Sequence, residues 1–425
     1  MTYSVAGESG RLAGAERGRN ALALAIFLLA AAAFLLRFTI SPEVLDRFEN
    51  YTGDSGSFVQ KLHIGTYAIL LVLPLALFSR PFVLRGDEIG KFKALLRYLG
   101  LLVALMLYLG LVGHFSTSGF LIDTYLSAGA AGLIMMTQSE DARRRLGDII
   151  VLMLVVSALM GIFEAVTHHR ILPYDNVEAV FRPIGLTEHP LALGTLCAAG
   201  IGFAASTHWR IWLRVAACFV LLIGCAVSGA RFALLTAAVE VLLLLLLTPW
   251  PRLSRQHARQ AKAIVLLLVL VGGAGLVALL AGAGLLSRFG DGVFDANAMV
   301  RLSIYDIFNF VSWQSLLFGM PANALIDVVQ KQLHLPTLES APIAIIMLFG
   351  LPMALFFAGL LAWIVLRLLR FASAATSIAT FTFFVAALSN NALSTKTPAF
   401  AIALVLVLAY SNRAPKTAQP SAGRG

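Results

Sequence analysis

Long apolar runs recur along the whole 425-residue chain and limit what it can fold into. A helix needs about 20 predominantly apolar residues to cross the hydrocarbon core of a bilayer. Only 13% of the residues are charged, against about 25% in soluble domains. We therefore expect an all-α polytopic membrane protein with about 12 transmembrane helices. The predicted spans lie near 20–40, 63–80, 94–113, 119–137, 147–167, 190–207, 211–228, 232–250, 263–286, 341–366, 372–389 and 396–411.

Basic residues are concentrated in alternate connections between these runs. If the N-terminus is cytoplasmic, about 22 of the 32 Lys and Arg residues fall on the same side of the membrane. The positive-inside rule then predicts that both termini are cytoplasmic. It also explains the net charge of +10 without a nucleic-acid partner. The first run, 20–40, is too long for a signal peptide and lacks a clear cleavage site, so we expect it to remain as a helix.

The predicted domain organisation is a membrane domain over 1–412 and a disordered cytoplasmic tail over 413–425. The membrane domain includes a large outer loop near 287–340, between spans 9 and 10. This loop mixes charges with aromatic and aliphatic residues, and 306–317 has the pattern of an amphipathic helix lying at the interface. The three cysteines lie in apolar stretches and are predicted to be small core residues (Cys197, Cys218 and Cys225).

Ionisable residues near membrane depth are costly and therefore informative. Asp123, inside a predicted span, is expected to make a polar contact within the bundle. The outer-face candidates are Arg182, Arg231, Arg288, Arg301, Glu188, His189 and Glu339. An arginine at such a position can bind an anion, because its guanidinium forms two parallel hydrogen bonds to phosphate oxygens. The alternatives are a headgroup contact for Arg182, snorkelling for Arg231 and a salt bridge within the loop for Arg288.

Glu339 directly precedes a predicted span, next to Ser340 and Pro342. A carboxyl beside an apolar wall tends to have a raised pKa, which suits a general acid or base. The alternative is a purely structural helix start, with Ser340 as the N-cap. The chain has no Walker motif, Rossmann fingerprint, zinc-binding helix or nucleophile elbow. We therefore expect no cofactor and no metal.

Two short motifs resemble those of a known superfamily. The stretch from Arg182 through Gly185 to Gly194 resembles the Arg–Gly–Pro–Gly segment that opens a mid-chain helix in the O-antigen ligase and Wzy-type polymerase superfamily. Ser228-Gly229-Ala230-Arg231 resembles its Ser-x-x-Arg hairpin, and the large outer loop matches its layout. The resemblance covers roughly 150–370.

The resemblance implies a bacterial inner-membrane glycosyltransferase that uses an undecaprenyl-diphosphate-linked oligosaccharide as donor. Arg182, Arg231 and Arg301 would then hold the diphosphate and stabilise it as the leaving group. Arg288, Glu188 and His189 complete the expected substrate-binding set, and Glu339 is the expected catalytic base. Membrane lipid, a chain-length regulator and a flippase are the other expected partners.

This chain differs from the family pattern at one place that distinguishes ligases from polymerases. Ligases of the family carry a histidine at the end of the large loop, about ten residues before a glycine, where this chain has Glu339-Ser340 and then Gly350. We therefore favour polymerisation of repeat units into exopolysaccharide or O-antigen over ligation to an acceptor. His334 is the alternative base. A transporter, a flippase or a non-catalytic subunit of the same pathway are the rival functions, although no internal repeat typical of transporters is seen.

Overall fold

The computed structural model describes residues 5–52, 60–174, 181–248, 303–335 and 338–411, with short stretches between 256 and 278. Side chains are described from residue 18 onward. Helices make up almost all of the regular structure in these ranges, and no strand occurs there. They are α1 (Val5–Thr39), α2 (Pro42–Leu45), α3 (Ile64–Phe78), α4 (Asp87–Leu111), η1 (Phe115–Thr117), α5 (Ser118–Phe120), η2 (Leu121–Leu126), α6 (Ser127–Thr137), α7 (Glu140–Thr167), α8 (Pro190–Ser206), α9 (Ile211–Val227), α10 (Arg231–Leu247), η4 (Ile304–Asp306), α13 (Ile307–Phe310), α14 (Trp313–Phe318), α15 (Ala322–Lys331), α16 (Ala341–Phe349), α17 (Leu351–Leu369), α18 (Ala374–Leu388) and α19 (Ala399–Tyr410).

The all-helical prediction is confirmed for the described residues. Helices occupy every predicted span within them, and five helical segments are long and apolar enough to cross a membrane: 18–39, 87–111, 118–137, 140–167 and 351–369. Shorter apolar helices include α3, α8, α9, α18 and α19. Most of the predicted span 263–286, the first part of the large loop and the tail from 413 lie outside the described residues.

Two predicted helices are interrupted. The span predicted as 341–366 breaks at Gly350, which adopts φ +79° between α16 and α17. A side chain there would lie 2.2 Å from the Leu317 carbonyl oxygen, so the break also lets α14 approach closely. The amphipathic helix predicted over 306–317 is wrong as one element. The extended Val311 and the N-cap Ser312 divide it into α13 and α14.

The core consists of helices that are apolar on every side, as expected for helices without a solvent face. Every residue of α19 is buried, and so is every residue of α6. Small residues let these helices approach one another. Gly147 of α7 packs against Ala409 of α19, and Gly224 of α9 packs against Ala158 of α7. Cys197 and Cys225 are buried and Cys218 is half-buried, all as free thiols, which confirms them as core residues.

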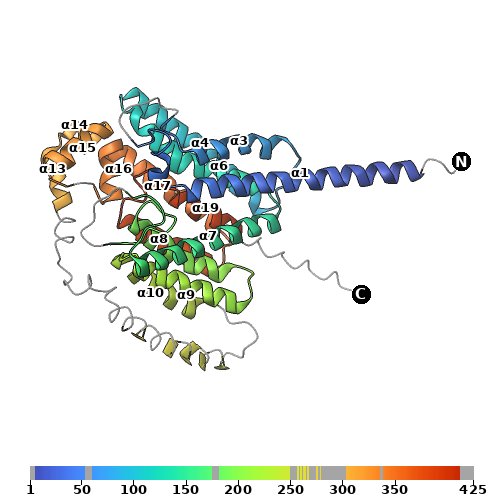
Figure 1. The fold of residues 1–425 in the computed structure, drawn as a ribbon. Coiled ribbons are helices and arrows are strands. Elements are labelled where there is room, and N and C mark those ends of the chain that lie inside the picture. Colours follow the sequence, from blue (N-terminus) through green and yellow to red (C-terminus); the bar gives the residue numbers. More distant parts are fainter. Residues whose placement is uncertain are drawn as a thin grey trace, which may run out of the picture.

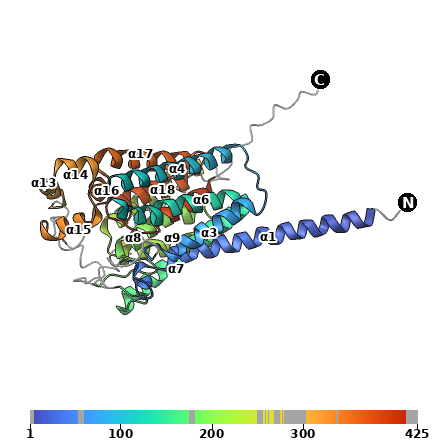
Figure 2. The ribbon, with the colours of Figure 1, turned by 90° about the horizontal axis from the view of Figure 1, so that it is seen from above.

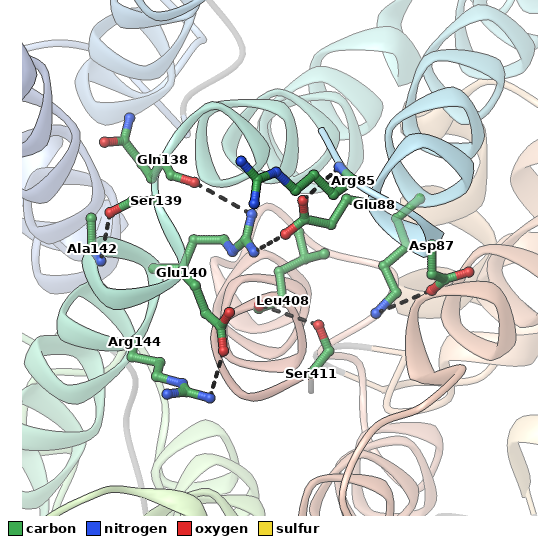
Figure 3. A network of polar contacts seen from close by, with 12 residues as sticks. Arg85, Asp87, Glu88, Gln138, Ser139, Glu140, Ala142, Arg144, Leu408 and Ser411 are labelled. Carbon is green, nitrogen blue, oxygen red and sulfur yellow. Dashed lines mark hydrogen bonds and ion pairs between the residues drawn. The ribbon is translucent and has the colours of Figure 1, made fainter. Parts of the chain in front are cut away.

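The helices lie roughly side by side, so the bundle has two distinct ends. The first turns of α1 project from the end opposite α13, α14 and α15, as both Figure 1 and Figure 2 show. At the end of the bundle where α1 begins, hydrogen bonds and ion pairs join α4, α6 and α7 (Figure 3). Arg143 of α7 pairs with Glu88 of α4 and donates to the Gln138 carbonyl. Arg143, from one predicted cytoplasmic loop, therefore meets Glu88, from the beginning of α4, at this end of the molecule.

Candidate functional site

The candidate site lies at the other end, where α7 ends, α8 begins and the α9–α10 hairpin turns. The connection from α7 to α8 is described at 168–174 and 181–189. It carries the predicted residues Arg182, Glu188 and His189. Pro190 is the first residue of α8 and has a φ suited to the first helical position.

A buried carboxylate on α7 fixes the conformation of this connection. Glu164 is fully buried, and its Oε2 accepts the backbone N–H groups of Ile184 at 2.8 Å and Gly185 at 3.0 Å. Its Oε1 accepts the N–H of Ile171 at 3.2 Å. Bonds from backbone N–H groups to a carboxylate are charge-assisted and stronger than neutral ones. The segment after Arg182 is thus tied to the last turns of α7.

Gly185 is required for this arrangement. Its φ of +58° favours glycine, and a Cβ there would lie 2.3 Å from the Ser157 carbonyl oxygen. The Ser157 hydroxyl also accepts the next backbone N–H, that of Leu186, at 3.0 Å. Two side chains on α7, Ser157 and Glu164, lie about two helical turns apart and hold three successive N–H groups of the connection.

The structure brings Arg182 to the hairpin that contains Arg231. Arg182 Nε donates to the Ser228 carbonyl oxygen at 3.1 Å. Gly229 has φ +68°, and the Ser228 hydroxyl accepts the Ala230 N–H at 3.2 Å, which closes the turn. Arg231 follows as the first residue of α10 and is half-buried. The two arginine-bearing motifs, separated by 46 residues, therefore share one surface.

Arg170 adds a third guanidinium to this surface. It donates to the Arg182 carbonyl oxygen, with Nη2 at 3.0 Å, and lies over the rings of Tyr174 at 4.2 Å and Phe181 at 4.8 Å. Such cation–π contacts hold the guanidinium in place. We call Arg170, Arg182 and Arg231 the arginine cluster.

His189 adjoins the arginine cluster, and Glu188 precedes it in the chain. His189 caps α8, its Nδ1 accepting the Leu191 N–H at 3.2 Å. Burial, together with Arg182 and Arg170, lowers the His189 pKa to about 4, so the ring is neutral near pH 7. Burial raises the Glu188 pKa to about 7. A neutral histidine and a carboxyl that titrates near neutrality are both suited to handling protons.

A second polar cluster surrounds Asp123, which is fully buried in the π-helical turn η2. Its carboxylate accepts the Tyr51 hydroxyl at 2.9 Å and the His63 N–H at 3.0 Å. The buried Arg37 donates to its backbone carbonyl at 3.1 Å. His63 Nδ1 accepts the Gly65 N–H and Nε2 lies 3.0 Å from the Ile40 carbonyl, so the proton is on Nε2. The predicted interior contact of Asp123 is confirmed.

Glu339 lies directly before α16. It is half-buried and precedes Ser340, which is the N-cap of α16 although its hydroxyl makes no capping bond. The Ala341 N–H donates to the Asn390 carbonyl at 3.1 Å, and Asn390 Nδ2 donates to Thr195 of α8 at 3.0 Å. In the described part of the chain, the Glu339 carboxylate contacts neither Arg182 nor Arg231. The alternative base His334 is exposed, with φ +54°. Arg288 and Arg301 lie outside the described residues.

One residue of the site was missed from the sequence, and another had only a weak signal there. Glu164 is an acid inside a predicted span, and that placement alone was a usable signal because such residues are costly. Arg170 belongs to the run His168-His169-Arg170, which by itself is a weak metal or anion signal. Its role depends on two aromatic neighbours that only the folded connection brings to it.

No family model matches the sequence, and a comparison with curated proteins finds no significant match.

Proposed function

We propose that the protein is a multi-pass glycosyltransferase of the bacterial inner membrane that polymerises lipid-linked oligosaccharide repeat units. The donor would be an undecaprenyl-diphosphate-linked oligosaccharide and the product an exopolysaccharide or O-antigen. Both termini would be cytoplasmic, and the 287–340 loop and the arginine cluster would face the periplasm. A flippase and a chain-length regulator would act beside it.

The observation that carries the proposal is the shared surface of Arg182 and the Ser228–Arg231 hairpin. Arg182 donates to the Ser228 carbonyl oxygen of the hairpin, and Arg170 donates to the Arg182 carbonyl oxygen, so both guanidinium groups are held at the end of the bundle where Arg231 begins α10. A lipid-linked diphosphate has an apolar chain that suits the helices and two phosphates that suit arginine. A site at a bundle end, level with the headgroups, can accept both parts at once.

In this reaction the bond between the anomeric carbon and the diphosphate oxygen breaks, and a bond to an acceptor hydroxyl oxygen forms. The arginine cluster would stabilise the negative charge that develops on the departing diphosphate. A carboxylate would take the proton of the acceptor hydroxyl. Glu339 is the predicted base, and Glu188, with its pKa near 7, lies on the same connection as Arg182.

The test is complementation of a deletion strain, with glycan chain length analysed by gel electrophoresis. Removing one preorganised donor to a developing anion costs about 100- to 1,000-fold in rate. We therefore expect Arg182→Ala and Arg231→Ala to abolish long polymer, and Arg231→Lys to restore only part of it. Arg210→Ala is the matched control, because Arg210 precedes α9 at the opposite end of the bundle.

The products distinguish the rival functions. Loss of a polymerase leaves single repeat units, whereas loss of a ligase leaves long polymer that is not attached to its acceptor. Loss of a flippase or transporter leaves the donor on the cytoplasmic side. If both alanine variants are present at wild-type levels in the membrane and restore full-length polymer, the role of the arginine cluster is wrong.

A further inference from the structure

A groove of about 680 Å³ runs between α4 and α17 on the surface of the bundle. The two helices lie side by side (Figure 2), and each is long and apolar enough to cross a membrane. Most of the lining residues are exposed, so in a bilayer this surface faces lipid. The walls include Arg97, Gly100 and Leu101 of α4, and Phe356, Gly359 and Trp363 of α17. None of these residues belongs to the arginine cluster.

Two glycines form the hollow of the groove. A Cβ at Gly100 or at Gly359 would meet no atom within 4 Å, so both positions face open space. They differ in this from Gly147 and Gly224, which let neighbouring helices approach closely. Glycine inside a helix is less favourable than alanine, and at these two positions no packing against the described residues offsets that cost. The glycines therefore leave room for a molecule that lies along the two helices.

Arg97 is the charged residue of this lining. It is also the one charged residue in the sequence from 94 to 111, so it lies within the apolar part of α4. Charged side chains at such depth usually face the bundle interior and pair with one another or with backbone carbonyls. Arg97 is exposed instead, and no described residue forms a hydrogen bond or ion pair with it. We therefore expect its counter-charge to come from a molecule outside the chain.

The position of Arg97 along α4 brings its guanidinium toward the headgroup level. Asp87, the first residue of α4, pairs with Arg367 of α17 at 3.0 Å, which holds these two helix ends at one level. Arg97 follows ten residues later, about 15 Å along the helix axis. Helical side chains lean toward the start of their helix, and a long arginine can extend further in that direction. Lys93, one turn nearer the start, is exposed on the same face of α4. Two cations therefore lie at the headgroup end of an apolar groove.

We propose that this groove, named here the α4–α17 groove, binds an anionic phospholipid of the phosphatidylglycerol type. The phosphate would accept two parallel hydrogen bonds from the Arg97 guanidinium, and Lys93 would add electrostatic attraction. One acyl chain would lie along the apolar walls, over Gly100 and Gly359. A free phosphate would leave those walls uncovered, and a neutral acyl chain would leave Arg97 without an anion. This inference does not depend on the proposed glycosyltransferase function.

The test is native mass spectrometry of the purified full-length protein, delipidated in detergent and titrated with phosphatidylglycerol or with phosphatidylcholine of the same acyl chains. We expect phosphatidylglycerol to bind more tightly. Loss of a hydrogen bond to a charged group corresponds to about a tenfold change in affinity, so Arg97→Leu should weaken phosphatidylglycerol binding about tenfold. Gly359→Leu fills the groove and should weaken the binding of both lipids. The matched controls are Arg145→Leu and Ala358→Leu, because both residues are exposed and lie outside the groove lining. They should bind lipid as the wild type does.

Photolabelling then locates the lipid. Phosphatidylglycerol with a diazirine on its acyl chain should label peptides around Leu101 and Phe356, and this labelling should fall in Arg97→Leu and Gly359→Leu. Wild-type affinity in either of these variants, or labelling spread evenly over all lipid-facing helices, would overturn the proposal. So would a disulfide-linked dimer formed through Gly359→Cys in the lipid-supplemented protein, because a second copy of the chain would then occupy the groove.

Discussion

Replacing Glu164 by glutamine tests whether this buried acid positions the connection that carries Arg182. The glutamate accepts three backbone N–H groups, from Ile171, Ile184 and Gly185, on its two oxygens. Glutamine has one acceptor oxygen, and in either orientation of the amide its NH₂ group faces one of these backbone N–H donors. We therefore expect the substitution to remove at least one of the three bonds and to weaken the others.

The magnitude follows from the bond types. A hydrogen bond to a charged group contributes about 1.5–3 kcal/mol, and a neutral one about half as much. Losing one bond and halving two gives a local loss of about 3 kcal/mol at the low end of that range. Because about 1.4 kcal/mol corresponds to a tenfold change in an equilibrium, the connection should open about 100-fold more often.

Hydrogen exchange measured by mass spectrometry reads this opening directly. The Ile184 and Gly185 amides should exchange about 100-fold faster in Glu164→Gln, while the buried helix α19 stays protected. Glu140→Gln is the control. It weakens the Glu140–Arg144 pair at 2.7 Å at the opposite end, a contact type worth about 0.5 kcal/mol or less. Unchanged exchange at Ile184 and Gly185 would refute the positioning role.

Three further predictions concern stability, measured as unfolding midpoints in detergent. Asp123→Asn should destabilise by about 1.5–3 kcal/mol, because the amide is uncharged and has one acceptor oxygen, whereas the carboxylate accepts the Tyr51 hydroxyl on one oxygen and the His63 N–H on both. The His189 pKa is about 4 when folded, against 6.5 ordinarily, so its contribution is complete above pH 6.5 and falls as pH drops to 4. His189→Asn keeps a cap and should flatten that fall. Gly185→Ala should cost about 1–3 kcal/mol, whereas Gly100→Ala, which meets nothing within 4 Å, should be neutral or stabilising.

The helices could be predicted from the sequence because each apolar run is long enough to form a helix that packs into the bundle. The exceptions have local causes. The run 341–366 contains Gly350-Leu351-Pro352, and a glycine with a proline two residues later favours a helix end followed by a new helix start. Hydropathy does not report such a break, because the residues on both sides are equally apolar.

For the acids inside the bundle, the sequence predicts only that burying them is costly, and it does not predict their partners. Asp123 and Glu240 are both acids within predicted spans, but their partners come from distant parts of the chain. Asp123 uses donors 72 and 60 residues away, and Glu240 Oε1 accepts the Gly202 N–H at 3.0 Å. Which donors reach each acid depends on how the helices pack, and no local pattern contains that information.

The Arg182 motif shows how a short sequence signal depends on a residue outside it. Pro183 has no N–H, so the first two donors after Arg182 are those of Ile184 and Gly185, and both reach the same Glu164 oxygen. Gly185 permits this because its φ of +58° turns the backbone toward α7. Motif and acid therefore act as one unit: without Glu164 the proline and glycine would still form a turn, but nothing would fix that turn to the bundle. The position of the Arg182 guanidinium beside the Ser228–Arg231 hairpin is thus set by an acid 18 residues earlier in the chain.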